Sequence, residues 1–346
     1  MKILLVACLA LCQPFVGLAG TIRDDRNDSL YTGLAAQPQF RASGYLRIGT
    51  AGFGSGTLID PEWVLTAAHC VIDELGPTAT TWRFEIGGQV VDIPIENVYF
   101  PPAWITSGFD AGYDVALLRL PKPFRGVRPA ALYTDRDEVG KVITTLGYGT
   151  TGNGQTGNLL PSGTRRAGQN TIDATTSFIS IPGYVMPPLA VGSDRTILYD
   201  FDSPQGSTST IGSAKPLNLE YSGAPGDSGG GAFVMAGSGS RILGVVSRGY
   251  SPNGRAQSVY GTTAVYTRVS SNVAWIRSVQ AGREMPMPTL LAQVQQGTLM
   301  RAAAVSKERA DMAAAKGYRV SRFIGVAADA SSEGKGAFDA TPRVPE

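Results

Sequence analysis

Cysteine and histidine are scarce in this chain, whose 346 residues include three cysteines and one histidine. Cys8 and Cys12 lie in an N-terminal segment that we expect to be cleaved off, which leaves Cys70 without a partner. An intrachain disulfide is therefore excluded, and an exported domain without one must depend on its hydrophobic core. The single histidine, His69, is the only imidazole that the chain offers for acid–base chemistry.

A large excess of one charge and long hydrophobic runs are also lacking. The 30 basic and 28 acidic residues give a net charge of +2, which provides no large field to attract nucleic acid or an anionic membrane. Beyond the N-terminus, no stretch approaches the roughly 18 uninterrupted apolar residues of a membrane span. We expect a soluble mature protein whose partner is neither nucleic acid nor membrane, and the oligomeric state stays open.

The first twenty residues have the features of a secretory signal peptide. Lys2 supplies the charged end, Ile3–Leu11 the apolar run, and Gly17–Ala19 a cleavage site of small residues. The mature chain is expected to start near Gly20 or Thr21 and to be secreted or periplasmic. A lipoprotein processing box ending at Cys8 is disfavoured because the apolar run before it is short.

Strand signals dominate the rest of the chain. The 43 glycines and 22 prolines interrupt it too often for long helices, and short apolar or alternating segments between turn residues predict serial β-strands. One set falls within residues 21–130 and ends in a proline-rich linker, and a second falls within 131–278. No amphipathic helix separates successive strands, so two all-β barrels or sandwiches fit better than βαβ units.

Two regions differ in composition from these sets. Residues 148–216 are rich in Gly, Ser, Thr and Asn and predict an insertion of long loops, with strands expected at Ile172–Ile181 and Thr196–Phe201. Gly147-x-Gly149-x-x-Gly152 matches a dinucleotide fingerprint, but no helix signal follows it. Residues 279–346 form a tail that we expect to be partly helical, with the alanine-rich stretch Met300–Lys316 as its clearest candidate.

Three short segments together carry a chemical signal. Gly226-Asp227-Ser228-Gly229-Gly230 places a serine between glycines, which allows a tight turn with two N–H groups aimed at one point. A serine hydroxyl needs a base, and His69 ends the apolar segment that starts at Trp63. The imidazole needs an acceptor to fix its tautomer, and Asp114 opens an apolar strand. Alone, each segment is ordinary: a core histidine, a turn aspartate, a glycine loop.

In the order His, Asp, Ser, these segments resemble the chymotrypsin/trypsin family of serine peptidases, in a secreted bacterial form without disulfides. Thr66-Ala67-Ala68-His69-Cys70, Asp114-Val115-Ala116-Leu117-Leu118 and the Gly226–Gly230 pentapeptide all match its signatures. The resemblance covers about residues 44–278, and Trp275-Ile276 resembles the start of the family's closing helix. It implies an all-β fold of two six-stranded antiparallel Greek-key β-barrels with a C-terminal helix and tail.

The resemblance also implies the roles of individual residues. Ser228 would attack a peptide carbonyl, His69 would take and return the proton, Asp114 would hold His69, and the amides of Gly226 and Ser228 would form the oxyanion hole. No metal or organic cofactor is required, and the partner is a polypeptide substrate. Ser222 would lie at the base of the substrate pocket.

The pocket walls would come from Ser247, Gly249 and Ala264, with Ser247 also supporting Asp114. Neutral Ser222 and the methyl group of Ala264 favour cleavage after an apolar residue of medium size. Glutamyl endopeptidases of the same family use a pocket histidine where this chain has Val246, although Arg248 could supply a positive charge.

Several positions depart from the family pattern. Gly54 and Ala224 replace cysteines, and no Ile-Val-Gly-Gly start follows a basic cleavage site. Asp227, which would normally pair with the new N-terminus, is expected to bind the signal-cleaved N-terminus or an internal arginine. The alternatives are a catalytically silent or zymogen-locked binding protein, and an esterase that uses the same triad. An α/β-hydrolase is disfavoured because its residues come in the order Ser, Asp, His.

Overall fold

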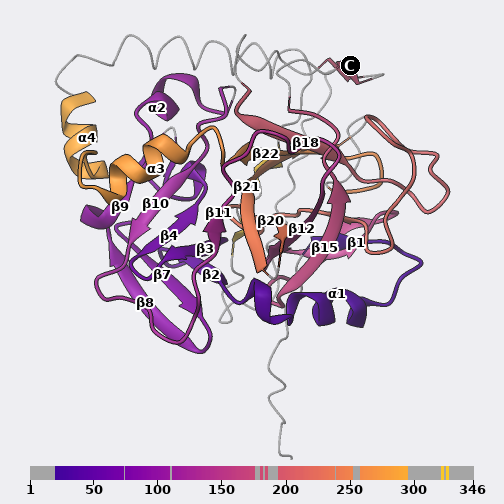
Figure 1. Cartoon of the computed structure of the whole chain (residues 1–346), viewed down its shortest axis with the longest axis horizontal. Coiled ribbons are helices and arrows are strands. Elements are labelled where there is room, and N and C mark those ends of the chain that lie inside the picture. The colour runs from indigo at the N-terminus through magenta and orange to yellow at the C-terminus, as the bar shows by residue number, and fades with distance from the viewer. Residues whose placement is uncertain are drawn as a thin grey trace, which may run out of the picture.

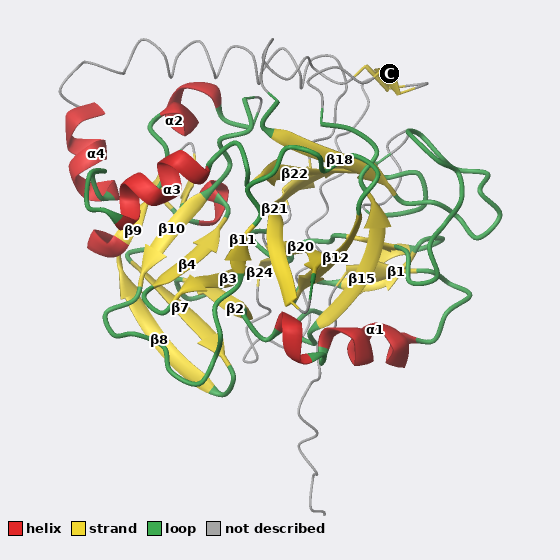
Figure 2. Ribbon diagram, viewed as in Figure 1, coloured by secondary structure: helices red, strands yellow, loops and turns green. Residues whose placement is uncertain are grey.

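Two curled β-sheets lie side by side, with the few helices at their margins (Figures 1 and 2). The computed structural model describes residues 20–73, 75–109, 111–175, 180–181, 184–185, 194–237, 239–251, 258–294, 321–322 and 325–326. The expected signal peptide and the alanine-rich stretch 300–316 lie outside these residues. The mostly β architecture of two half-barrels confirms the predicted two-barrel fold.

The first sheet runs in the order β8-β7-β2-β3-β4-β10-β9, and β24 pairs with β3 off this path. Its strands are β2 (Ser43–Ile48), β3 (Gly52–Asp60), β4 (Trp63–Thr66), β7 (Thr81–Ile86), β8 (Gln89–Pro94), β9 (Val98–Tyr99), β10 (Ala116–Arg119) and β24 (Gly325–Val326). β7 shows why the sequence forms these strands. Trp82, Phe84 and Ile86 are buried, whereas the residues between them face outward, as the two-residue period of a half-buried strand requires.

The second sheet runs in the order β15-β12-β20-β21-β22-β18, with β11 and β23 each paired to β21. Its strands are β11 (Ala131–Leu132), β12 (Val142–Gly147), β15 (Arg166–Thr171), β18 (Thr196–Asp200), β20 (Gly231–Ala236), β21 (Gly239–Tyr250), β22 (Thr263–Arg268) and β23 (Ser321–Arg322). The path has the six strands expected for each barrel. The first sheet has seven on its path, because two-residue β9 joins it through β10.

Small sheets and helices complete the fold. One four-stranded sheet has the order β14-β13-β1-β19, with β1 (Gly20–Ile22), β13 (Thr151–Asn153), β14 (Gly157–Leu160) and β19 (Tyr221–Ser222). Two further sheets have two strands each: β5 (Ile72–Asp73) pairs with β6 (Gly76–Pro77), and β16 (Ser180–Ile181) pairs with β17 (Tyr184–Val185). The α-helices are α1 (Asp28–Ala35), α2 (Ala103–Ser107), α3 (Val273–Gln280) and α4 (Met287–Gln293), and the 3₁₀-helices are η1 (Pro38–Phe40), η2 (Ala68–Cys70) and η3 (Ile95–Asn97).

The region 148–216 is not all insertion, which corrects the expectation from composition. β15 and β18 fall inside it and are full members of the second sheet. Of the strand expected at Ile172–Ile181, residues 176–179 lie outside the described residues and Ser180–Ile181 form β16. The strand that pairs with β12 is the earlier β15, whose sequence RAGQNT gives no apolar signal. Some of its polar groups form hydrogen bonds inside the fold, although Nη1 of Arg166 has no partner among the described residues. Asn170, for example, donates to the carbonyl of Asp200 and to Glu220.

The C-terminal helices return from the second sheet to the first (Figure 1). α3 follows β22 directly, as the resemblance predicted, and buries Ile276 and Val279 in the core of the first half. α4 adds Met287 and Leu290 to the same core. The start of the tail is therefore an ordered part of the fold, and it ties the two halves together.

Candidate active site

Ser228, His69 and Asp114 meet between the two sheets, although they are far apart in sequence. Nε2 of His69 lies 2.7 Å from Oγ of Ser228, and Nδ1 lies 2.7 Å from Oδ2 of Asp114. All three residues are buried. A carboxylate only accepts hydrogen bonds, so Nδ1 carries the ring proton and Nε2 is left to accept from the serine hydroxyl.

Each of these side chains is placed by a different local structure. His69 lies in η2, directly after β4, and its own amide donates to Oδ1 of Asp114 at 2.9 Å. Asp114 precedes β10, which pairs with β4, so the register of two neighbouring strands brings the two residues together. Ser228 lies in the turn between β19 and β20, in the second half of the chain.

The electrostatics of the pair favour an ionised carboxylate beside the imidazole. Burial alone raises the pKa of Asp114, but the charge of His69 and three hydrogen-bond donors outweigh it, so the pKa lies below its ordinary value. For His69, burial lowers the pKa and the negative charge of Asp114 raises it, with a net increase. Asp114 therefore stabilises the imidazolium that forms when His69 accepts a proton.

Ser247 and Arg248 complete the surroundings of Asp114. The hydroxyl of Ser247 donates to Oδ2 of Asp114 at 2.5 Å, which agrees with its expected supporting role. Arg248 is fully buried, with its guanidinium 5.4 Å from the ring centroid of Phe109 and 5.8 Å from that of Tyr250. Its Nη2 has no hydrogen-bond partner among the described residues.

The turn that carries Ser228 requires glycine. Gly226 has φ of +99°, and a Cβ there would lie 2.1 Å from the ring of Phe53. Gly229 has φ of +79°, and a Cβ would lie 2.0 Å from Oγ1 of Thr66. Within the part of the chain that the structure describes, the amides of Gly226 and Ser228 donate to no other group, so both are free for a ligand.

Among the described residues Asp227 is held by neutral donors and not by an arginine, which corrects one of the two expected partners; the other, the signal-cleaved N-terminus, stays a prediction. The hydroxyl of Tyr221 and the amide of Ala224 each donate to Oδ2 at 2.9 Å, and the amide of Gly149 donates to Oδ1 at 2.8 Å. Arg166 is buried nearby, but its guanidinium pairs with Asp28. Burial raises the pKa of Asp227 to about 6, and the three donors oppose that rise.

The N-terminal strand β1 covers this arrangement. It lies between β13 and β19, and Gly20 packs so closely on Tyr221 that a Cβ would come within 2.0 Å of the phenol oxygen. Sequence reasoning missed Tyr221, because nothing local marks a tyrosine seven residues before the serine as a partner of Asp227.

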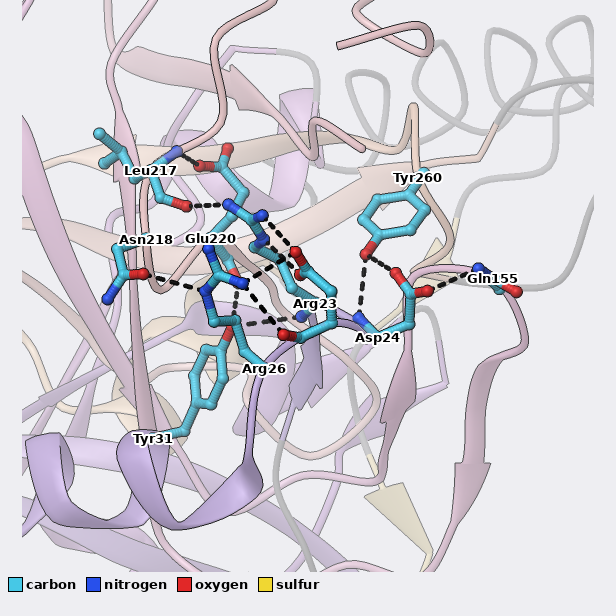
Figure 3. A network of polar contacts seen from close by, with 10 residues as sticks. Arg23, Asp24, Arg26, Tyr31, Gln155, Leu217, Asn218, Glu220 and Tyr260 are labelled. Atoms are coloured by element: carbon cyan, nitrogen blue, oxygen red, sulfur yellow. Dashed lines mark hydrogen bonds and ion pairs between the residues drawn. The ribbon is translucent and has the colours of Figure 1, made fainter. Parts of the chain in front are cut away.

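The residues after β1 are anchored to the second half by a polar network (Figure 3). Arg23 donates to the carbonyl of Leu217 at 2.7 Å, and its amide donates to the hydroxyl of Tyr31, which in turn donates to the carbonyl of Glu220. Tyr260 donates to the carboxylate of Asp24. These contacts hold β1 against β19 and Tyr221.

The expected pocket residues lie on neighbouring strands. Gly249 of β21 pairs with Ala264 of β22, and both are buried. Ser222 is fully buried and pairs with Thr21 of β1. Gly54 faces Cys70, because a Cβ at Gly54 would lie 3.2 Å from the sulfur. No group of three or more His, Cys, Asp or Glu side chains in the described residues is arranged to hold a metal ion.

Comparison with known proteins agrees with this geometry. The family described as Trypsin matches residues 33–184, a range that contains His69 and Asp114. The thrombin-like enzyme gyroxin B1.7 of Crotalus durissus terrificus is 28% identical over 236 residues, which is 66% of this chain and 78% of that protein. The chain is therefore similar to serine proteases of the trypsin family.

Other members of the trypsin family match shorter parts of the chain or carry different descriptions. Chymotrypsin-like elastase family member 1 of Rattus norvegicus is 37% identical over 73 residues, which is 19% of this chain but only 26% of that protein. Inactive snake venom serine proteinase 13 of Crotalus adamanteus is 27% identical over 236 residues, or 77% of its length. Because the trypsin family includes members named inactive, activity has to be argued from the site.

Proposed function

We propose that this protein is a serine endopeptidase that works through a triad of Ser228, His69 and Asp114. The observation that carries the proposal is the unbroken chain of contacts from the serine hydroxyl through both imidazole nitrogens to the carboxylate, at 2.7 Å each. An inactive scaffold has no need to keep this geometry together with two free amides beside the serine.

In the proposed reaction, Ser228 Oγ attacks the peptide carbonyl while His69 Nε2 accepts its proton. The amides of Gly226 and Ser228 stabilise the oxyanion of the tetrahedral intermediate. His69 then gives the proton to the leaving amine, and water hydrolyses the acyl-enzyme by the same steps in reverse. Asp114 stays ionised and stabilises the imidazolium throughout.

We infer that the protein is exported by its N-terminal signal and cleaves after apolar residues of medium size. Ser222 at the pocket base is neutral, and the methyl group of Ala264 stands where glycine would leave more room. These features argue against a preference for Arg or Lys. In the described residues no helix is long and apolar enough to cross a membrane.

Labelling with a fluorophosphonate probe tests the proposal. Purified wild-type protein should be labelled, Ser228→Ala should not, and Ser29→Ala, which changes an exposed serine of α1, should be labelled like the wild type. Labelling that appears only after pretreatment with trypsin would indicate a zymogen. No labelling under either condition would support the silent binding protein and refute the proposed activity.

A further inference from the structure

Near Ser228, β21 and β3 each have one edge that does not pair with a strand on the main path of its sheet. β21 pairs with β20 only as far as Val245, because β20 begins at Gly231, directly after the turn that carries the serine. Arg248 and Gly249 therefore have β22 on one side and an open edge on the other. On β3, pairing with β4 begins at Thr57, which leaves an edge open at Gly52 and Phe53.

The open edge of β3 leads directly to the nucleophile. The amide of Ser55 donates to the carbonyl of Ser228 at 2.7 Å, on the side of β3 that faces away from β2. Since residues two apart in a strand face the same edge, Phe53 presents its backbone groups on that side as well. On β21, Ser247 bonds Asp114 and directly precedes Arg248. The two open edges thus flank the triad.

The C-terminal segment of the chain occupies both edges. β23 pairs antiparallel with β21, with Ser321 opposite Gly249 and Arg322 opposite Arg248. β24 pairs antiparallel with β3, with Gly325 opposite Phe53 and Val326 opposite Gly52. Only two residues, Phe323 and Ile324, separate the two strands in the sequence. Three Cα–Cα steps cover at most about 11 Å, so the Cα atoms of Arg322 and Gly325 lie within that distance of each other and the two edges are close together.

We propose that β23 and β24 occupy the substrate-binding edges of this protein in the manner of a substrate and exclude other polypeptides. Strand addition of this kind supplies main-chain hydrogen bonds whatever the side chains are. The inference rests on the proposed function, because it treats the two edges as the place where a peptide substrate binds.

Because β23 and β24 belong to the same chain as the two edges, even a weak affinity between them keeps the edges occupied most of the time. β23 and α4 belong to the same chain, and a covalent link between two binding partners gives effective concentrations of about 1 mM. A segment with a dissociation constant of about 0.1 mM would then be bound roughly nine-tenths of the time. The apparent affinity for a competing polypeptide would fall about tenfold, by the fraction of sites left free.

The test uses the full chain with Ser228→Ala, so that the occupant cannot be cut. Ser321→Pro with Gly325→Pro removes two amide donors and prevents pairing of both strands. Ala337→Pro serves as the matched control in the same tail. We expect the double variant to exchange amide hydrogens faster at residues 52–53 and 248–249, and to bind fluorescently labelled casein about tenfold more tightly, while the control matches the parent.

The inference would be overturned if amide hydrogens at residues 52–53 and 248–249 exchanged equally fast in the parent and the double variant, or if both bound casein with equal affinity. The proposed function is judged separately, by fluorophosphonate labelling of the chain with Ser228 intact. Labelling together with equal exchange would retain the peptidase and reject the tail as its occupant. Slower exchange in the parent without any labelling would keep the docked tail and reject the peptidase.

Discussion

Replacement of Tyr221 by phenylalanine tests whether a neutral hydrogen bond holds the turn that carries Ser228. The change removes the hydroxyl that donates to Asp227 at 2.9 Å and leaves the ring in place against Gly20. Burial holds the pKa of Tyr221 far above its ordinary value, so the hydroxyl stays protonated and serves as the donor. Without it, the buried carboxylate keeps only two amide donors, those of Gly149 and Ala224.

A hydrogen bond to a charged group contributes about 1.5–3 kcal/mol. Asp227 lies between the two residues whose amides are proposed to bind the oxyanion, so a displaced carboxylate would disturb both. If the whole free energy of the lost hydrogen bond appears as weaker stabilisation of the transition state, the rate of fluorophosphonate labelling falls by about 10- to 100-fold. Each 1.36 kcal/mol is a factor of ten in rate. The global stability of the fold would fall by no more than the same amount.

Tyr31→Phe is the matched control. Tyr31 is also fully buried and belongs to the same cluster as Tyr221, but its hydroxyl donates to the carbonyl of Glu220 and does not touch Asp227. We expect Tyr31→Phe to lower the melting temperature without slowing labelling. Labelling of Tyr221→Phe at the wild-type rate, or an equal loss in both variants, would refute the reasoning.

Four further predictions concern the site and its surroundings. The labelling rate should rise with pH with a midpoint above 6.5, the ordinary pKa of histidine, because His69 must be neutral to act as a base and Asp114 raises its pKa. Asp114→Asn should slow labelling by about 10⁴-fold, through loss of the correct tautomer, and an unchanged rate would contradict the triad. Gly54→Cys should form a disulfide with Cys70, detectable as a loss of free thiol on oxidation, and raise stability by about 3 kcal/mol for a loop of this length. Burial, then Asp200 and Asp173, raise the pKa of Asp202 from 3.8 to about 7; the folded state therefore favours the protonated form, and stability in urea should decline as pH rises through that range, less so in Asp202→Asn.

The motifs around the triad could be predicted because each is local. A glycine-flanked serine, a histidine after an apolar strand and an aspartate before another are all visible in a few consecutive residues, and the family supplies their order. The two 2.7 Å contacts of His69, with Ser228 and with Asp114, depend on strand pairing that cannot be read from the sequence. The helix at Asp28–Ala35 was not predicted, although Asn27, which caps it by accepting from the amide of Ser29, is a readable start signal.

Other features could not be predicted from the sequence in the same way. Tyr221 became a partner of Asp227 only through the turn between them. β15 is a polar strand in which Asn170 donates to Glu220, a residue far along the chain. β23 and β24 are two residues each, too short for any periodicity. Such strands exist because an open edge accepts them, so the partner strand and not their own composition determines where they form.

The single histidine makes this protein an unusually direct object for spectroscopy. Since the only imidazole lies between Ser228 and Asp114, a chain grown with isotopically labelled histidine would give one set of ring signals in nuclear magnetic resonance. Those signals would need no assignment. The position of the ring proton could be followed in the whole protein, before and after addition of a ligand, without any substitution in the chain.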